Sequence, residues 1–112
     1  MIYVAVSPHR NNYPDPISFE PGDTVALGRR DAQHPGWVWV TAPSGKQGWA
    51  PESFVRIDTP EEGVATSAYT ARELNTDVGE RLSCVTELAG WLWVENEKGE
   101  SGWVPKDTVR AT

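Results

Sequence analysis

One sequence feature constrains this chain more than any other: a segment of twenty-one residues that occurs twice. The first copy, residues 36–56, reads GWVWVTAPSGKQGWAPESFVR, and the second, residues 90–110, reads GWLWVENEKGESGWVPKDTVR. Ten of the twenty-one positions are identical, and all six tryptophans of the protein lie inside the two copies. An internal repeat of this kind predicts two similar structural units.

Large side chains alternate with β-branched ones in the first copy, which is typical of a β-strand with two different faces. Trp37 and Trp39 are expected on the same face. A turn at residues 44–45 would fold the segment into a hairpin. That hairpin would place Trp39 opposite Trp49 and Trp37 beside Pro51.

The second copy has the same pattern, with its turn expected at residues 98–99. This turn would place Trp93 opposite Trp103 and Trp91 beside Pro105. Cross-strand aromatic pairs of this kind contribute roughly 0.2 to 1 kcal/mol each relative to alanine. We therefore expect two matching tryptophan hairpins.

Short apolar runs and Gly or Pro turns precede each hairpin, and helical periodicity is absent beyond single turns near residues 51–53 and 105–107. This spacing predicts an all-β fold of two small closed barrels in tandem. The expected domains are residues 1–58 and 64–112, joined by a linker of residues 59–63 that contains a proline. A linker this short favours a fixed or narrowly hinged pair.

The net charge of −6 is divided unevenly, with −1 on residues 1–58 and −5 on residues 59–112. Because neither half has a basic stripe, a nucleic-acid partner is not expected. The single cysteine, Cys84, excludes an internal disulfide and predicts a buried structural thiol. No run approaches the roughly 20 apolar residues of a membrane span, and the first residues do not read as a signal peptide. We expect no membrane association and a cytoplasmic location.

The segments ISFEPGD and ELNTDVGE, each followed by GW and then by GWAPESFV or GWVPKDTV, resemble a known family. They are similar to the "ELSF..GD" and "G.FPSNYV" signatures of SH3 domains. The order and spacing of these motifs hold twice, over nearly the whole chain. The sequence thus resembles tandem SH3 domains, with features of the bacterial, variant SH3-like members.

The resemblance implies binding of extended, often proline-rich peptides in a shallow aromatic groove. The groove tryptophan of the family corresponds to Trp37 and Trp91, and the groove proline to Pro51 and Pro105. The closing tyrosine corresponds to Phe54 in the first unit, whereas the second unit has a threonine, Thr108.

The family's opening "ALYDY" motif fits less well. AVSPH, residues 5–9, lacks both tyrosines, while residues 65–69 keep only Tyr69. Tyr13 is a candidate substitute in the first groove. Glu73, Asp77 and Glu87 are expected on loops beside the second groove, where acids would pair with a basic ligand residue or simply face solvent.

The two tryptophan ladders are expected to point outward, where they would form an interface. Packing between the two domains and contact with an external partner are both possible. One ladder consists of Trp39 and Trp49, and the other of Trp93 and Trp103. The two histidines, His9 and His34, are interpreted as isolated surface residues.

No catalytic motif, cofactor site or metal-binding pattern is apparent, which favours a protein without enzymatic activity. The preferred interpretation is a non-catalytic adaptor that binds extended peptide segments, proline-rich or basic, through Trp37 and Trp91 and their neighbours. Two alternatives remain: a bacterial SH3-type module that binds peptidoglycan peptides of the cell wall, and a structural subunit whose aromatic faces are buried in an assembly.

Overall fold

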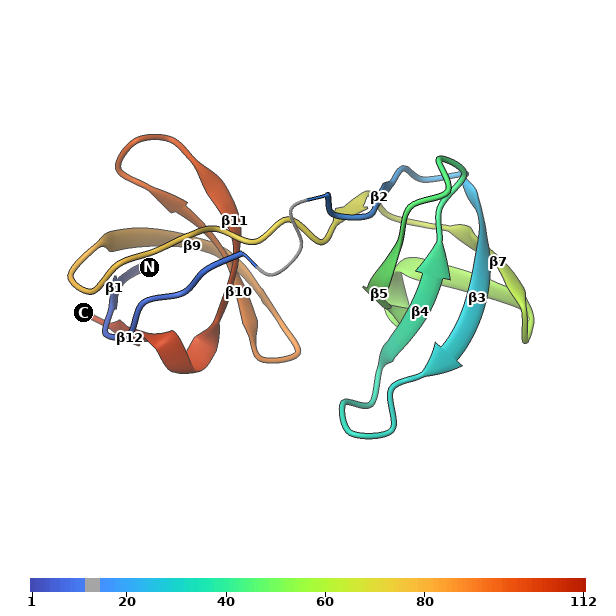
Figure 1. Cartoon of the computed structure of the whole chain (residues 1–112), viewed down its shortest axis with the longest axis horizontal. Helices are drawn as coiled ribbons and strands as arrows, with labels where there is room; N and C mark the ends of the chain where they lie inside the picture. Colours follow the sequence, from blue (N-terminus) through green and yellow to red (C-terminus); the bar gives the residue numbers. More distant parts are fainter. Residues whose placement is uncertain (12–14) are drawn as a thin grey trace. The chain divides into compact units, whose positions relative to one another are not determined.

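The computed structural model describes residues 1–11 and 15–112. The chain divides into two compact units (Figure 1). Unit 1 combines Met1–Pro14 with Arg72–Thr112, and unit 2 is the continuous segment Asp15–Ala71. The chain therefore passes from unit 1 into unit 2 and back again.

Unit 2 is built on a five-stranded sheet with the order β5-β4-β3-β7-β6, and β2 pairs with β8 in a separate two-stranded sheet. All of its described strand pairs are antiparallel. The elements are β2 (Ser18–Phe19), β3 (Thr24–Arg30), β4 (Trp37–Thr41), β5 (Gln47–Pro51), the 3-10 turn η1 (Glu52–Phe54), β6 (Val55–Thr59), β7 (Glu62–Ala65) and β8 (Tyr69–Thr70).

Unit 1 has a sheet of the same size, with the order β11-β10-β9-β1-β12. Strand β1 lies in its interior, antiparallel to both β9 and β12. The elements are β1 (Ile2–Ala5), β9 (Arg81–Leu88), β10 (Trp91–Asn96), β11 (Ser101–Pro105), the 3-10 turn η2 (Lys106–Thr108) and β12 (Val109–Ala111).

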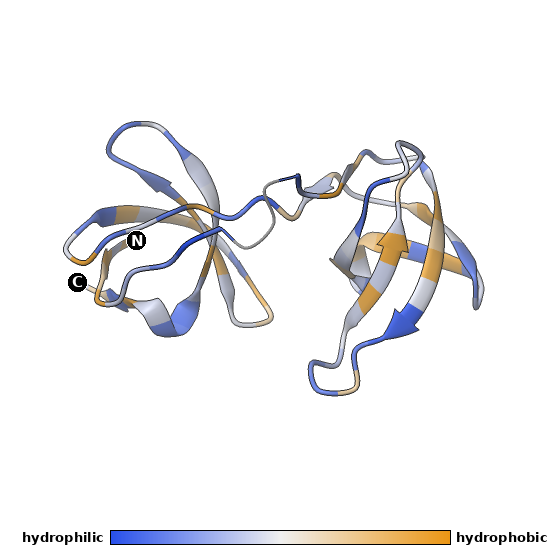
Figure 2. Ribbon diagram, viewed as in Figure 1, coloured by the Kyte–Doolittle hydropathy of each residue, from blue (hydrophilic) through white to orange (hydrophobic). Residues whose placement is uncertain are grey.

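Each unit has its own hydrophobic core, because alternate residues of its strands point inward. Figure 2 shows hydrophobic residues spread over the strands of both units. The core of unit 1 consists of Ala5, Leu74, Leu82, Leu92, Val94, Val104 and Val109. Buried hydrophobic residues of unit 2 include Ile17, Phe19, Val25, Leu27, Val38, Val40, Ala50, Val55 and Ala65. Cys84, expected to be buried, is half-buried and packs against the unit 1 core.

The two tryptophan hairpins form as the repeat predicts. In unit 2, Trp39 pairs with Trp49 and Trp37 with Pro51. In unit 1, Trp93 pairs with Trp103 and Trp91 pairs with the proline at 105. The single helical turns are η1 and η2, each directly after the proline that ends the second hairpin strand.

The division of the chain differs from the expected domains 1–58 and 64–112. The expected linker, residues 59–63, is instead the end of a β-hairpin within unit 2: Thr59 ends β6, and Glu62 and Gly63 begin β7, which folds back on β6. Gly63 permits this close approach, since a Cβ there would lie 2.6 Å from the Arg56 carbonyl oxygen. The boundaries between the units therefore fall at residues 14/15 and 71/72.

Each barrel takes its opening strand from the other half of the sequence: β1 comes from residues 1–58 and β7 from residues 59–112. Ala5 of β1 pairs with Val109 in unit 1, and Ala65 of β7 pairs with Val55 in unit 2. Both alanines are almost fully buried, so each fills the equivalent place in its barrel. The two barrels are thus related by an exchange of opening strands within one chain.

This exchange predicts which fragment of the chain folds alone. Residues 15–71 contain every strand of unit 2, so this fragment should unfold cooperatively on heating, as followed by tryptophan fluorescence and circular dichroism. The complement, residues 72–112, lacks β1 and should be unfolded, because β9 and β12 then lose the strand between them. A fragment 15–71 that stays unfolded where a 1–58 fragment folds would contradict the exchange.

Candidate functional site

The unit 2 aromatic cluster comprises Trp37, Pro51, Phe54 and Tyr69. Trp37 opens β4 and lies opposite Pro51, the last residue of β5. The extended backbone of Pro51 leads into η1, and this turn places Phe54 at its end. Trp37 and Phe54 are half-buried and Pro51 is buried, so the two rings are the accessible part of the cluster.

Tyr69 completes this cluster from β8, a strand that lies in the second half of the sequence, residues 59–112. Its ring packs edge-on against Phe54 at 5.8 Å and tilted against Phe19 at 5.6 Å. Its hydroxyl donates a hydrogen bond to the Trp49 carbonyl oxygen at 3.3 Å. Only 8 % of the surface of Tyr69 is exposed, so its ring packs against the Phe54 ring from the interior of the barrel.

The unit 1 cluster has the same plan with different chemistry: Trp91, Pro105, Thr108 and His9. Trp91 lies opposite Pro105 at the end of a tight turn in which Ala89 and Gly90 both have positive φ angles of 48° and 87°. Thr108 occupies the place of Phe54, and its hydroxyl donates to the Pro105 carbonyl oxygen at 2.7 Å. This cluster therefore lacks one aromatic wall.

His9 occupies the place of Tyr69 in unit 1, because it pairs with Thr76 as Tyr69 pairs with Phe19. Its ring stands edge-on to Trp91, with 5.9 Å between the ring centroids. The interpretation of His9 as an isolated surface residue was therefore wrong. The exchange of opening strands brings it into a mixed cluster with a tryptophan.

Glu73 was expected on an exposed loop, where it would meet a ligand, and the structure corrects this. Its carboxylate lies 2.7 Å from His9 Nε2, and the two side chains are only 6 % and 10 % exposed. A carboxylate can be buried at low cost only when it is paired, and His9 supplies the partner. Glu73 is thus positioned behind the Trp91 cluster, bound to a residue of the protein itself.

The other two acids beside unit 1 are exposed, as expected. Glu87 accepts a hydrogen bond from the Lys106 ammonium at 3.0 Å, and this bond, with the attraction between the two charges, raises the pKa of Lys106. Asp77 pairs with Arg10 at the surface. Asp77 lies outside the strands, whereas Glu87 lies near the end of β9 and not on the loop expected from the sequence. Exposed pairs of this kind contribute roughly 0 to 1 kcal/mol, so they orient these side chains more than they stabilise the fold.

The two tryptophan ladders share one geometry, with T-shaped pairs at 5.3 Å between ring centroids. They are less exposed than expected: Trp39, Trp49 and Trp93 are half-buried, and Trp103 is buried at 8 % exposed. In unit 2 the guanidinium carbon of Arg29 lies 5.0 Å from the Trp39 ring and 5.1 Å from Trp49. This ladder therefore carries a cation supplied by its own sheet.

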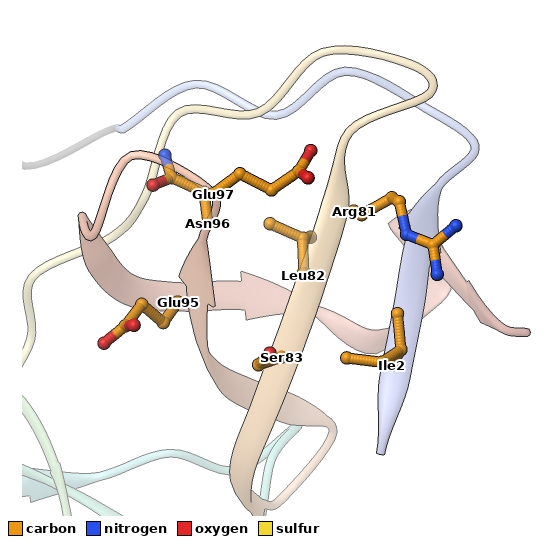
Figure 3. Close-up of a pocket in the computed structure, with 7 residues that line it drawn as sticks. All are labelled: Ile2, Arg81, Leu82, Ser83, Glu95, Asn96 and Glu97. Carbon is orange, nitrogen blue, oxygen red and sulfur yellow. The ribbon is translucent and has the colours of Figure 1, made fainter.

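A small hollow of about 210 Å³ lies elsewhere on unit 1, on the strands β1, β9 and β10 (Figure 3). It is lined by Ile2, Arg81, Leu82, Ser83, Glu95, Asn96 and Glu97. None of these residues belongs to the aromatic clusters.

Tyr13, proposed from the sequence as a substitute groove residue, lies outside the described residues. Within residues 1–11 and 15–112, no group of three His, Cys, Asp or Glu side chains could hold a metal ion. In the same part of the chain, no helix has the length and apolar composition that crossing a membrane requires.

Small β-barrels with a tryptophan, a proline and a closing aromatic ring on a 3-10 turn define a class of protein-interaction domains. The variant SH3 domain family matches residues 2–58, and this chain belongs to that family. Such domains generally bind protein or peptide ligands and are generally not catalytic. The family match runs along the sequence of the first half, while the structure exchanges the opening strands.

The chain is similar to the "SH3 and PX domain-containing protein 2A" of mouse and to that of human. Each is 41 % identical over 54 residues, which is 48 % of this chain and 4 % of the relative. The chain therefore spans a small part of the length of these curated relatives. No solved structure matches the chain.

The buried His9–Glu73 pair predicts a stability effect that sequence reasoning missed. Replacing Glu73 by Ala leaves the buried His9 ring without its partner, so we expect a loss of about 1 to 3 kcal/mol in the free energy of unfolding. Urea unfolding of the whole chain measures this loss. Glu97→Ala, at an exposed position of the same unit, is the matched control and should be neutral. Equal effects of both variants would contradict a buried pair.

Proposed function

We propose that this protein is a non-catalytic adaptor that binds extended, proline-rich peptide segments of a partner protein, and that the unit 2 aromatic cluster is the binding surface. The observation that carries this proposal is the juxtaposition of Trp37 with Pro51 and of Phe54 with Tyr69 in one barrel. Membership of the SH3 family supports the same class of ligand.

Physical reasons favour a polyproline II ligand at such a surface. The peptide is already extended, so docking it costs little conformational entropy, and indole faces pack well against proline rings. The buried Tyr69 ring packs edge-on against Phe54, and this contact keeps the accessible Phe54 ring in one orientation. A preorganised surface spends less binding free energy on ordering its own side chains.

Charge favours a basic residue in the ligand of unit 2. Residues 15–71 contain four basic and eight acidic side chains, a net charge of −4. An acidic barrel attracts basic peptides and speeds their association, and this effect weakens as salt screens the charges. The proposed ligand is therefore proline-rich with at least one arginine or lysine.

The unit 1 cluster is proposed to contribute little to binding of the same ligand. His9 is tied to Glu73, and Thr108 offers a hydroxyl bonded to its own backbone in the place of an aromatic wall. Two barrels with the same plan would thus differ in function because of two residues. This difference supplies the control for the experiment.

Titration with a proline-rich, arginine-bearing peptide, followed by intrinsic tryptophan fluorescence, tests the proposal. We expect a saturable change that Trp37→Ala weakens by about thirtyfold, because truncating an aromatic anchor costs about 2 kcal/mol. The matched variant Trp91→Ala should leave the affinity nearly unchanged. The proposal is contradicted by a folded Trp37→Ala protein that binds as well as the original.

A further inference from the structure

The ladder of unit 2 contains a cation-binding arrangement within the protein. Arg29, on β3, lies over both rings of the T-shaped pair Trp39–Trp49. The face of an indole attracts a guanidinium electrostatically when the cation lies within about 6 Å of the ring centroid. Both distances, 5.0 and 5.1 Å, satisfy this condition.

Unit 1 has the same ladder with an uncharged residue at the corresponding position. Trp93 and Trp103 form a pair at the same 5.3 Å, with an interplanar angle of 76° against 82° in unit 2. The register identifies Thr86 as the counterpart of Arg29, because Thr86 lies directly opposite Trp93 on β9. Trp93 is half-buried and Trp103 is buried, so Trp93 offers the accessible indole of this ladder.

A negative charge lies beside Trp93, on the same strand β10. Glu95 follows Trp93 by two residues on β10, and therefore projects from the same face of the sheet. Its counterpart in unit 2 is the uncharged Thr41, since Ala26 pairs with Thr41 as Ser83 pairs with Glu95. Unit 2 thus has an internal cation at its ladder, and unit 1 has an anion.

The Glu95 carboxylate is available to an external cation. The residue is exposed, and no ion pair involves it in the described part of the chain. Figure 3 shows its side chain pointing away from Arg81, which lies on the other side of the hollow. The nearest partners of Glu95 across the strands are serines, Ser83 and Ser101.

We propose that Trp93, Thr86 and Glu95 form a site that accepts the guanidinium of an arginine from a partner peptide. The arginine would take the place that Arg29 occupies in unit 2, with its plane on the Trp93 indole and its edge toward Glu95. The site uses no residue of either aromatic cluster. It therefore goes beyond the proposed function, and each of the two can fail without the other.

Arginine fits this site better than lysine. A guanidinium is planar, stacks on an aromatic face and can donate two parallel hydrogen bonds to one carboxylate. A lysine ammonium is a compact, strongly hydrated charge without a flat face to stack. Citrulline has nearly the shape of arginine without its charge, so it separates stacking from electrostatic attraction.

The direct experiment uses the whole ¹⁵N-labelled protein and the indole N–H signals of its tryptophans in NMR. The probes are the capped pentapeptides Gly-Gly-Arg-Gly-Gly, its lysine counterpart and its citrulline counterpart. The Trp93 signal is identified by its loss in Trp93→Phe. We expect saturable shifts of the Trp93 signal with the arginine peptide, smaller shifts with lysine and none with citrulline. Equal shifts with citrulline, or none with arginine, would overturn the proposal.

A second test places an arginine of the protein itself in the proposed site. Thr86→Arg copies the arrangement of unit 2, so its own guanidinium should compete and weaken binding of the arginine peptide by about fivefold or more. Thr86→Gln, long but uncharged, is the matched control and should retain binding. A folded Thr86→Arg protein that binds the arginine peptide undiminished would overturn the proposal.

A third test introduces the residues of the proposed site into unit 2, so that its result does not depend on whether a unit 1 variant folds. Arg29→Thr combined with Thr41→Glu gives unit 2 the residues of the unit 1 site, so the Trp39 signal should begin to respond to the arginine peptide. No response in the folded double variant would count against the proposed chemistry. Throughout, the response of Trp37 to a proline-rich peptide reports separately on the proposed function.

Discussion

The structure depends on the pairing of β1 between β9 and β12. This single strand, from residues 1–58, pairs with strands from residues 59–112. It thereby completes a barrel that is otherwise built mostly from the second half of the sequence. The pairing of β7 between β3 and β6 is its counterpart in unit 2. Both opening strands present a buried alanine at the equivalent place in their barrels, Ala5 in unit 1 and Ala65 in unit 2, which is consistent with the exchange.

The exchange also decides which side chains meet in the two clusters. Tyr69, from residues 59–112, packs against Phe54 and Phe19 from residues 1–58, and so a buried aromatic ring lies behind the accessible Phe54 ring in unit 2. His9, from residues 1–58, contacts Trp91 and Glu73 from residues 59–112. Without the exchange, each half of the sequence would have combined aromatic and non-aromatic groove residues: His9 with Phe54 in the first half, and Tyr69 with Thr108 in the second. Redistribution between the barrels concentrates the aromatic rings in one and the hydrogen-bonding groups in the other, which is why we assign them different roles.

The sequence predicted local features well because they follow from short-range rules. Alternation and turn residues placed Trp39 opposite Trp49 and Trp93 opposite Trp103, and the registers agree. The division of the chain could not be predicted in this way, because β1 and β7 both end in Val-Ala and the local pattern does not say which barrel each strand joins. The errors at His9 and Glu73 have the same origin: their partnership joins residues 64 positions apart and exists only once the strands have been exchanged. Arg29 was likewise missed, since nothing in the sequence shows that it reaches over two indoles.

The place of β1 has a consequence for the order of events during biosynthesis. The strand β1 is synthesised before its neighbours β9 and β12, so the unit 1 sheet can close only after β12 has been made. Unit 2 requires only residues 15–71 and can form while translation continues. Its early closure, with β7 already engaged, removes the competing strand before the second half appears. Because the order of synthesis and the final strand pairing agree, we expect the exchanged topology to form without first breaking another pairing.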